Sequence, residues 1–461
     1  MLHKIDLSTA KKVHFIGIGG ISMCGLAKIL QGDGYEVSGS DRSLSAATER
    51  LQAMGIKIYT PNAAENIQPD HDLVVYTAAI NPDNPEYAAA KEKNIPMMGR
   101  AELLAAITKG YARTVCVAGS HGKTTTTALL GGVALAGGLD PTVHIGGYLS
   151  GELNNRVGET PFFILEACEY KNSFLKWHPF IGTILNVDAD HIDFYGGMDG
   201  IIDSFKQFAH NIHPDGALII HEETQGYDRI VSDLTCKVIS FGVEPTADIY
   251  PGNITFTAEG KPTFDVLCKG AKLANIQLPL YGEYNIMNAL AVFSVAQILG
   301  LTPDVIKKGL EEAQGVKRRF EHKGRFNGTK IIDDYAHHPT EIRASLAAAR
   351  KAHAGRVVCL FQPHLYSRTR DLMNDFAQSF KDADIALFLP IYAAREAHDP
   401  TVTSNMLAEQ VFANEGDNKK HVECFADFYT AEEWLRKNLT PGDLLLTMGA
   451  GDVHIVGERL L

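Results

Sequence analysis

Residues 115–127 of the chain read Val115-Cys-Val-Ala-Gly-Ser-His-Gly-Lys-Thr-Thr-Thr-Thr127. The apolar run at Thr114–Val117 predicts a buried strand, the Gly-Ser-His-Gly that follows predicts a tight turn, and the periodicity of Thr124–Leu135 predicts a helix. A strand, turn and helix in this order point backbone N–H groups and the positive end of the helix dipole at one place, which suits a phosphate group. We therefore expect an α/β protein with a phosphate-binding loop.

The side chains of this loop add a charge and a hydroxyl group. Lys123 is expected to reach the β and γ phosphate oxygens of a nucleotide, and the Thr124 hydroxyl is a candidate Mg²⁺ ligand. The spacing Gly-x-x-Gly-Lys-Thr is shorter than that of the longer P-loop, because Val117 stands where the first glycine belongs. The alternative is a plain strand-to-helix turn with a solvated lysine. The candidate nucleotide-binding residues are Gly119, Ser120, His121, Gly122, Lys123, Thr124 and Thr125.

Length, charge and cysteine content limit the possible classes of protein. A chain of 461 residues is too long for one core and is expected to form roughly two to four domains. The net charge of -12 argues against a nucleic-acid-binding surface. The cysteines are scattered without a C-x-x-C pair, and the sequence has neither a signal-peptide core nor an apolar run of about 18 residues. We therefore expect a cytoplasmic protein, with no nucleic acid and no membrane as a partner.

A second glycine turn lies in Val13–Gly25. It follows a predicted strand, and the next predicted strand, Tyr35–Ser40, ends at Asp41. This order is typical of the dinucleotide fingerprint, in which a carboxylate about 20 residues further on meets a ribose hydroxyl, although Ser22 replaces the third glycine. The turn suits NAD, another diphosphate, or a helix that merely packs on a strand. The candidate ligand-binding residues are Gly17, Gly19, Gly20, Ser22 and Asp41.

Two further apolar runs in the middle of the chain end in acidic residues. Phe162–Leu165 leads into Glu166 and Glu169, and Ile181–Leu185 leads into the segment Asp188–Asp193. Ligands sit at the carboxyl ends of strands in α/β sheets, so we expect these ends and the phosphate loop to surround one metal and nucleotide site. The acidic segment also suits zinc or a solvated loop, but the phosphate loop favours Mg²⁺.

The rest of the chain predicts a β-rich insertion and another α/β unit. Thr235–Pro279 alternates apolar and polar positions. A helix then presents Asn285 and Asn288 on one face, either to adenine, or as caps or satisfied core amides. From about residue 315, strands and amphipathic helices alternate again. The first of these strands ends in Asp333-Asp-Tyr-Ala-His-His-Pro339, whose paired histidines suit a metal or a helix-capping turn, and a later loop carries Arg368.

Taken together, these motifs resemble the Mur ligase family. The matching stretches, in family order, are His14–Gly20, Ser38–Asp41, Gly119–Thr126, Asp190-His191, Gly282–Asn288, Arg318–Phe320 and Asp333–Glu341. The resemblance implies a Rossmann-like UDP-sugar-binding domain at residues 1–106 and a central P-loop ATPase-like, ATP-binding domain at 107–315. It also implies a Rossmann-like C-terminal domain at 316–461 that binds the amino acid and closes the site.

The resemblance further implies ATP-dependent ligation in peptidoglycan precursor synthesis. ATP would phosphorylate the lactoyl carboxylate of UDP-N-acetylmuramate, and L-alanine would attack the acyl phosphate, with Mg²⁺ as the metal and a monomer or homodimer as the working form. An alternative within the family joins a preformed peptide to the same UDP-sugar. Alternatives from other classes are a nicotinamide-dependent oxidoreductase, which would not need Lys123, Arg319 or Asp334, and a nucleotide-binding regulator.

The family pattern also implies roles for individual residues. Metal binding falls on Thr124, Glu169 and His191. Contacts with ATP fall on Lys123, Asn285, Asn288, Arg319 and Asp334. Catalytic roles fall on Lys123, His337 and Arg368, of which the last two also lie near the substrate carboxylates, and either His337 or a bound phosphate oxygen would accept the amine proton. Departures from the pattern occur at Cys168, Tyr170 and Leu365.

Overall fold

The computed structural model describes residues 7, 10–77, 80–147, 155–190, 192–394, 396–414 and 420–461. The chain forms two compact units. The first lies within Met1–Tyr250 and adds Cys268–Ala271 and Asn288–Leu310, and the second contains Pro251–Leu267, Lys272–Met287 and Glu311–Leu461. Within the described ranges, no helix has the length and apolar character that a membrane span requires.

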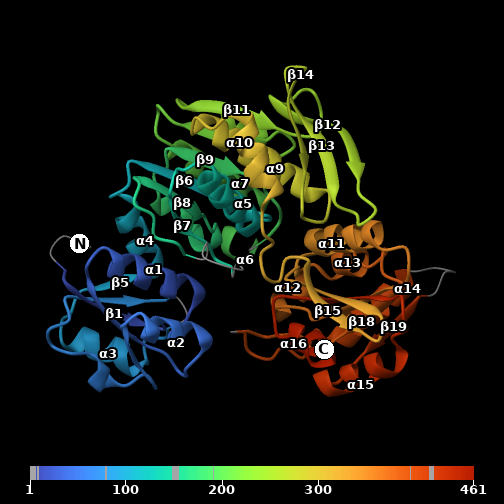
Figure 1. Cartoon of the computed structure of the whole chain (residues 1–461). Coiled ribbons are helices and arrows are strands. Elements are labelled where there is room, and N and C mark those ends of the chain that lie inside the picture. Colours follow the sequence, from blue (N-terminus) through green and yellow to red (C-terminus); the bar gives the residue numbers. More distant parts are fainter. Residues whose placement is uncertain are drawn as a thin grey trace. The chain divides into compact units, whose positions relative to one another are not determined.

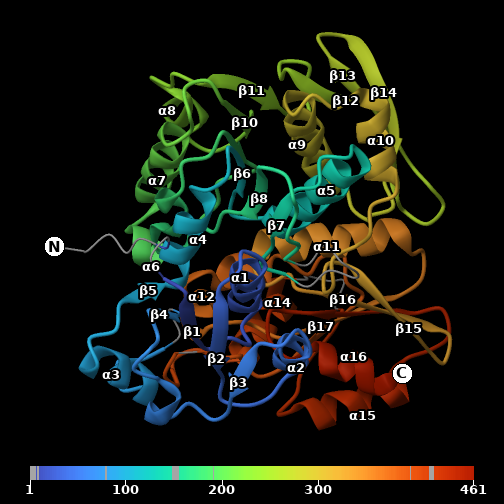
Figure 2. The ribbon, with the colours of Figure 1, turned by 60° about the vertical axis from the view of Figure 1, so that its left-hand side comes forward.

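The N-terminal sheet is drawn in blue in Figure 1, and Figure 2 labels its parallel strands, which have the order β3-β2-β1-β4-β5 in the described residues. Its strands are β1 (Lys12–Ile16), β2 (Glu36–Ser40), β3 (Lys57–Tyr59), β4 (Leu73–Tyr76) and β5 (Met97–Gly99). Its helices are α1 (Ile21–Gly32), α2 (Ala46–Ala53), α3 (Pro85–Glu92) and α4 (Arg100–Thr108), with a 3-10 turn at Ala64–Asn66. Figure 2 shows α1 and α2 beside β2 and β3.

Both faces of this sheet are buried. On β1, Val13 and Phe15 pack into one hydrophobic cluster and Ile16 into another, because alternate side chains of a strand point to opposite faces. Helices on both faces and a strand order that reverses at β1 define the Rossmann fold. The structure therefore confirms the predicted architecture of this part.

The central sheet has the order β14-β13-β12-β11-β10-β9-β6-β8-β7 over the part of the chain that the structure describes. Its strands are β6 (Arg113–Ala118), β7 (Thr142–His144), β8 (Phe162–Glu166), β9 (Ile181–Ile184), β10 (Ala217–His221), β11 (Lys237–Phe241), β12 (Ile249–Phe256), β13 (Pro262–Cys268) and β14 (Ala271–Gln277). The associated helices are α5 (Lys123–Ala136), α6 (Ile192–Tyr195), α7 (Met198–His210), α8 (Tyr227–Val231), α9 (Tyr284–Ile298) and α10 (Pro303–Glu311), with a 3-10 segment at Tyr170–Lys176.

The register of the central sheet explains where its ligands would bind. β6 lies between β8 and β9, with Val117 opposite Glu166 and Ala118 opposite Ile184. The carboxyl ends of these parallel strands therefore lie side by side, as predicted. Strands β11–β14 confirm the predicted β-rich insertion.

The C-terminal sheet has the order β15-β16-β20-β17-β18-β19 among described residues, with β15 antiparallel to β16 and the other neighbours parallel. Its strands are β15 (Glu321–Phe326), β16 (Thr329–Asp334), β17 (Val357–Phe361), β18 (Ile385–Phe388), β19 (His421–Cys424) and β20 (Leu444–Met448). Its helices are α11 (Pro339–Ala352), α12 (Tyr366–Asp371), α13 (Met373–Ala377), α14 (Ser404–Asn414), α15 (Phe428–Asn438) and α16 (His454–Leu460). Together with the other two sheets, it confirms the predicted α/β fold class.

Candidate nucleotide and substrate sites

The central glycine turn requires glycine at both of its glycine positions. Gly122 has a φ of 83° and directly precedes α5, and a Cβ here would come within 2.8 Å of Asn288 Oδ1. Gly119 has a φ of 142°, and its Cβ would lie 3.0 Å from Leu185 Cβ. A side chain at either position would be strained, so the Gly-x-x-Gly spacing follows from the close packing of this turn.

Lys123 turns its ammonium group back into the turn. Its Nζ donates hydrogen bonds to the carbonyl oxygens of Gly119 at 2.5 Å and Ser120 at 3.0 Å, and it pairs with Glu169 Oε2 at 2.9 Å. Burial lowers the pKa of Lys123, but the Glu169 carboxylate and neighbouring groups outweigh burial, so the net pKa is raised. The lysine therefore remains a cation inside the loop, where it can neutralise phosphate charge.

Thr124 contacts Glu166, whereas the family pattern implied Glu169 as the metal-binding glutamate. Its hydroxyl donates to Glu166 Oε1 at 3.1 Å, and Glu166 Oε2 accepts the N–H of Gly146 at 2.8 Å. Glu166 is the last residue of β8, whereas Glu169 lies beyond the strand and pairs with Lys123. The predicted set of site residues missed Glu166, although its position at a strand end was a signal for it. A hydroxyl beside a carboxylate is an oxygen donor set that fits Mg²⁺.

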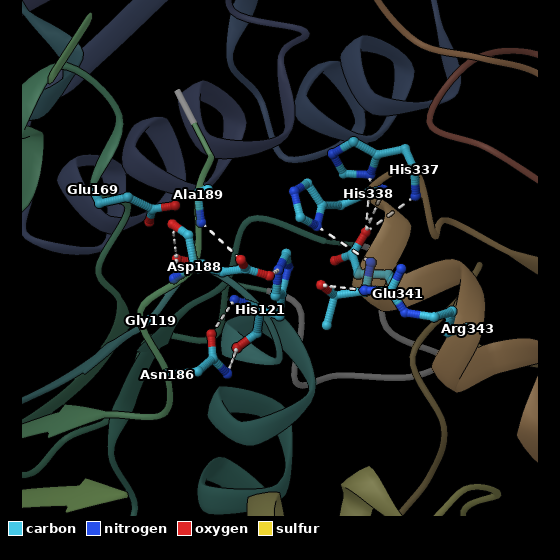
Figure 3. Close-up of polar contacts among 12 residues, drawn as sticks. Gly119, His121, Glu169, Asn186, Asp188, Ala189, His337, His338, Glu341 and Arg343 are labelled. Atoms are coloured by element: carbon cyan, nitrogen blue, oxygen red, sulfur yellow. Dashed lines mark hydrogen bonds and ion pairs between the residues drawn. The ribbon is translucent and has the colours of Figure 1, made fainter. Parts of the chain in front are cut away.

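The segment after β9 is hydrogen-bonded to the same turn, as Figure 3 shows. The His121 N–H donates to Asn186 Oδ1 at 2.8 Å, and Asn186 Nδ2 donates to the His121 carbonyl oxygen at 3.1 Å. His121 Nε2 lies 2.9 Å from Asp188 Oδ2. Asp188, which begins the acidic segment, therefore contacts the loop histidine. His191, an implied metal ligand, lies outside the described residues.

The N-terminal glycine turn rests on the end of β2. The N–H of Gly17 donates to the Ser40 carbonyl oxygen at 2.9 Å. The N–H of Gly19 donates to Asp41 Oδ2 at 2.8 Å, a Cβ on Gly19 would come within 2.7 Å of that oxygen, and Gly20 directly precedes α1. Asp41 therefore supports the turn itself, and its contact with a ribose stays a prediction.

Ser22 links the N-terminal turn to β7 within the first unit. Its Oγ lies 2.8 Å from His144 Nε2 and accepts a hydrogen bond from Arg100 Nη1 at 3.0 Å. Burial lowers the pKa of His144 to about 3, and the positive charge of Arg100 adds to this effect. His144 is therefore neutral at pH 7 and shares a hydrogen bond with the Ser22 hydroxyl. Sequence reasoning missed Arg100 and His144, because neither belongs to a local motif that signals the contact.

In the second unit, Asp334 supports the backbone around it. Its Oδ2 accepts the N–H of Phe320 at 2.9 Å, and its Oδ1 accepts the N–H of Ala336 at 2.7 Å. Burial raises the pKa of Asp334 to about 6, against the opposing effect of the Arg319 charge. The Arg319 guanidinium lies 5.0 Å from the centre of the Tyr335 ring. The structure thus brings Arg319 and Asp334 together, and their contact with ATP stays a prediction.

His337 and Arg368 also lie close together in the second unit. His337 Nδ1 lies 3.0 Å from the Tyr335 carbonyl oxygen, which can only accept, and 3.4 Å from Glu341 Oε2, so Nδ1 carries a proton. Arg368 Nη1 lies 3.2 Å from His364 Nδ1, and the rings of His364 and His337 are 5.7 Å apart. His338, labelled beside His337 in Figure 3, caps α11, which favours the capping interpretation for that histidine.

The two asparagines at the start of α9 are both buried. Asn285 Nδ2 donates to the Tyr281 carbonyl oxygen at 2.7 Å. The Oδ1 of Asn288 occupies the space beside Gly122 that a Cβ would need. The Asn285 amide therefore supports local backbone, the Asn288 amide packs against the glycine turn, and contact of either with adenine stays a prediction.

The geometry of the first unit defines a class of protein. A buried lysine in a glycine turn, at the start of a helix and beside strand-end carboxylates, is typical of an α/β protein that binds nucleotide phosphates. Residues 12–112 match the Mur ligase family catalytic domain, residues 117–296 the Mur ligase middle domain, and residues 318–451 the Mur ligase glutamate ligase domain. The chain therefore belongs to the Mur ligase family, as its motifs predicted.

Curated relatives align with nearly the whole chain. The UDP-N-acetylmuramate–L-alanine ligase of Clostridium kluyveri is 47% identical over 99% of this chain and 99% of its own. The enzyme of the same name from Agathobacter rectalis is 46% identical over 100% of both chains. Among solved structures, UDP-N-acetylmuramate-alanine ligase from Thermotoga maritima has a TM-score of 0.82 at 27% identity, covering 97% of this chain and 98% of that one. A murein peptide ligase from Psychrobacter arcticus shares the fold, with a TM-score of 0.71 at 22% identity over 98% of each chain.

Proposed function

We propose that this protein is an ATP-dependent ligase that joins L-alanine to the lactoyl carboxylate of UDP-N-acetylmuramate and forms ADP and phosphate. The observation that carries the proposal is the 47% identity to a UDP-N-acetylmuramate–L-alanine ligase over 99% of both chains. Ligation of a preformed peptide to the same UDP-sugar has less support, because the murein peptide ligase from Psychrobacter arcticus is 22% identical. Hydride transfer is not favoured, since it has no use for the buried Lys123 cation.

The first chemical step is phosphoryl transfer. A carboxylate does not react with an amine at neutral pH because oxide is a poor leaving group, whereas an acyl phosphate releases phosphate. Lys123 would neutralise charge on the transferred phosphoryl group, and its burial and raised pKa support this role. The family pattern assigns Arg319 to the nucleotide as well.

The metal is proposed to be Mg²⁺, held by the oxygens of Thr124 and Glu166. These oxygens lie 3.1 Å apart, and a hydroxyl with a carboxylate suits a hard cation. Bound Mg²⁺ would supply positive charge beside the phosphate oxygens. Glu169 pairs with Lys123 and remains a proposed metal ligand on the family pattern, and His191 keeps its implied role from the family pattern alone.

The second step is attack by the amine of L-alanine, which must be neutral. His337 is the proposed proton acceptor, because the Tyr335 carbonyl oxygen holds its Nδ1 proton, so that Nε2 would take up the amine proton. A bound phosphate oxygen is the alternative acceptor. Arg368 is proposed to bind a substrate carboxylate, to which its guanidinium group is suited.

The remaining assignments are proposals of the same kind. The nucleotide-binding set is Gly119, Ser120, His121, Gly122, Lys123, Thr124, Thr125, Asn285, Asn288, Arg319 and Asp334. The UDP-sugar set is Gly17, Gly19, Gly20, Ser22 and Asp41. We propose domain boundaries at residues 1–106, 107–315 and 316–461. We also propose that the protein is cytoplasmic and works as a monomer or homodimer.

Phosphate release tests the proposed function. The purified chain is supplied with ATP, Mg²⁺ and UDP-N-acetylmuramate, and L-alanine, L-serine, glycine and a tripeptide are compared in parallel. We expect phosphate and an amide product, detected by mass spectrometry, to depend on L-alanine and to disappear when EDTA removes the metal. Product with the tripeptide alone would favour the peptide ligase, and phosphate release without any amide would contradict ligation.

A further inference from the structure

The turn that carries Arg319 has an unusual backbone. Arg318 and Phe320, on either side of Arg319, have φ values of 60° and 50°. Positive φ is uncommon for residues other than glycine, and it persists only where the surrounding structure imposes it. The turn therefore needs contacts that hold it in this conformation.

One set of contacts comes from the Arg318 side chain. Its Nε donates to Asp333 Oδ2 at 3.0 Å, and its Nη2 donates to the Gly449 carbonyl oxygen at 2.7 Å. Asp333 is 1% exposed, and its other oxygen accepts the Thr447 hydroxyl at 2.8 Å. The Arg318 guanidinium is thus tied to the ends of β16 and β20, which are neighbouring strands of the C-terminal sheet.

A second set of contacts comes from the next residue of β16. Successive side chains of a strand point to opposite faces, so Asp334 approaches the turn from the other side and accepts the Phe320 N–H. The Tyr335 N–H also donates to the Arg318 carbonyl oxygen at 2.6 Å. The two aspartates therefore fix both residues that flank Arg319.

The guanidinium groups of both arginines share one aromatic ring. Arg318 lies 5.1 Å and Arg319 lies 5.0 Å from the centre of the Tyr335 ring. Arg318 donates hydrogen bonds to the Asp333 carboxylate and to the Gly449 carbonyl oxygen, so its role within this unit is to hold the turn in place. A shift of the turn would change the position of the Arg319 guanidinium group relative to the Tyr335 ring.

We propose that Arg318, through its pair with Asp333, is a positioning residue that sets the orientation of Arg319 for phosphoryl transfer. The inference rests on the proposed function, in which Arg319 contacts ATP. A displacement of about 1 Å can cost on the order of 100-fold in rate, so a positioning residue of this kind has a measurable effect.

A double-mutant cycle tests whether Arg318 acts through Arg319. Arg318→Ala is expected to lower kcat by about 10- to 100-fold, with the KM for UDP-N-acetylmuramate within about twofold of wild type. In the Arg319→Ala background, Arg318→Ala should lower kcat by less than about threefold further. Lys317→Ala, at the exposed neighbouring position, is the matched control and should keep wild-type kcat. The proposal would be overturned if the loss of kcat in the double variant equalled the product of the losses in the two single variants.

Two further variants separate positioning from folding and from backbone strain. Arg318→Ala with Asp333→Asn removes the buried unpaired carboxylate, and it should keep the low kcat while thermal unfolding returns toward wild type. Arg318→Gly relieves the positive φ but lacks the side chain, so its kcat should also be low. Wild-type kcat in Arg318→Gly would refute a role for the side chain.

The inference and the proposed function fail on different measurements. Alanine-dependent phosphate release by the wild-type protein tests the function. The same double-mutant cycle, measured as affinity for a non-hydrolysable ATP analogue, tests the coupling of the two arginines without turnover. Independent effects of Arg318 and Arg319 on that affinity would also overturn the inference.

Discussion

The two glycine turns of the first unit share a backbone plan and differ in charge. Each follows a parallel strand and precedes a helix, and the residue after each strand is a glycine of positive φ, 81° at Gly17 and 142° at Gly119. In the N-terminal turn, the Asp41 carboxylate accepts a backbone N–H. In the central turn, the Lys123 ammonium lies among carbonyl oxygens and beside Glu169.

This difference indicates that glycine spacing predicts a turn, whereas the neighbouring side chains select its ligand. A buried cation attracts a polyphosphate. A turn supported by a carboxylate has one N–H already bonded and presents an acceptor, which suits the hydroxyl groups of a nucleotide sugar. The proposed ATP and UDP-sugar sites follow this division.

The largest effect is expected at Lys123. Lys123→Ala should lower kcat by about 100-fold or more, because it removes the cation of the central turn, and should leave UDP-N-acetylmuramate affinity within about twofold of wild type. Calorimetry and phosphate release measure the two effects separately. A loss of UDP-sugar affinity as large as the loss of kcat would contradict the assignment of ATP to the central turn and the UDP-sugar to the N-terminal turn.

This substitution also needs a control for stability. Glu169 is 4% exposed and would lose its cation, which costs about 3 kcal/mol or more for a buried charge. Lys123→Met combined with Glu169→Gln removes that charge, so its thermal midpoint should recover while kcat stays low. Recovery of kcat in the double variant would show that Lys123 has only a structural role.

A smaller effect is expected at Asp41. Asp41→Ala leaves the Gly19 N–H without its acceptor and should weaken UDP-N-acetylmuramate binding by about 10-fold, with kcat at saturating UDP-sugar within about threefold of wild type. Asp41→Asn keeps an acceptor oxygen and should recover part of the affinity. Calorimetry checks both variants, and unchanged affinity in Asp41→Ala would remove Asp41 from the site.

The smallest effect is expected from pH, through the contact between Ser22 and His144. Burial, with the charge of Arg100, lowers the pKa of His144 from 6.5 to about 3, so the folded protein binds this proton less readily than the unfolded chain. The stabilising contribution is complete above about pH 6.5 and is lost as the pH falls toward 3. Between pH 7 and 6 we expect a loss of about 0.7 kcal/mol from this histidine, seen as a lower thermal midpoint.

His144→Asn should flatten this pH dependence. His71 provides a comparison outside the turns, because burial, with the charge of His14, lowers its pKa to about 4. His71→Asn should flatten the dependence independently, and the two effects should add. A wild-type pH profile in His144→Asn would contradict the assignment.

Much of the fold was predictable because local patterns specify short elements well. The strand predicted at Thr114–Val117 is β6 (Arg113–Ala118), and the helix predicted at Thr124–Leu135 is α5 (Lys123–Ala136), so each is one residue longer at both ends. The glycine turn between them separates the two patterns sharply. The strand predicted at Tyr35–Ser40 also differs by one residue, because β2 begins at Glu36.

The glycine, lysine and threonine of the central turn could be read from the sequence because the whole unit is local. The sequence could not decide which glutamate meets which of these side chains. Glu166 lies beside Thr124 because the register between β8 and β6 sets the position of Glu166 relative to the central turn. Glu169 lies between the end of β8 and two residues of left-handed backbone, Lys171 and Asn172, and from there it pairs with Lys123. Strand register and the path of such a segment depend on packing between distant parts of the chain, so only the tertiary structure assigned the two carboxylates.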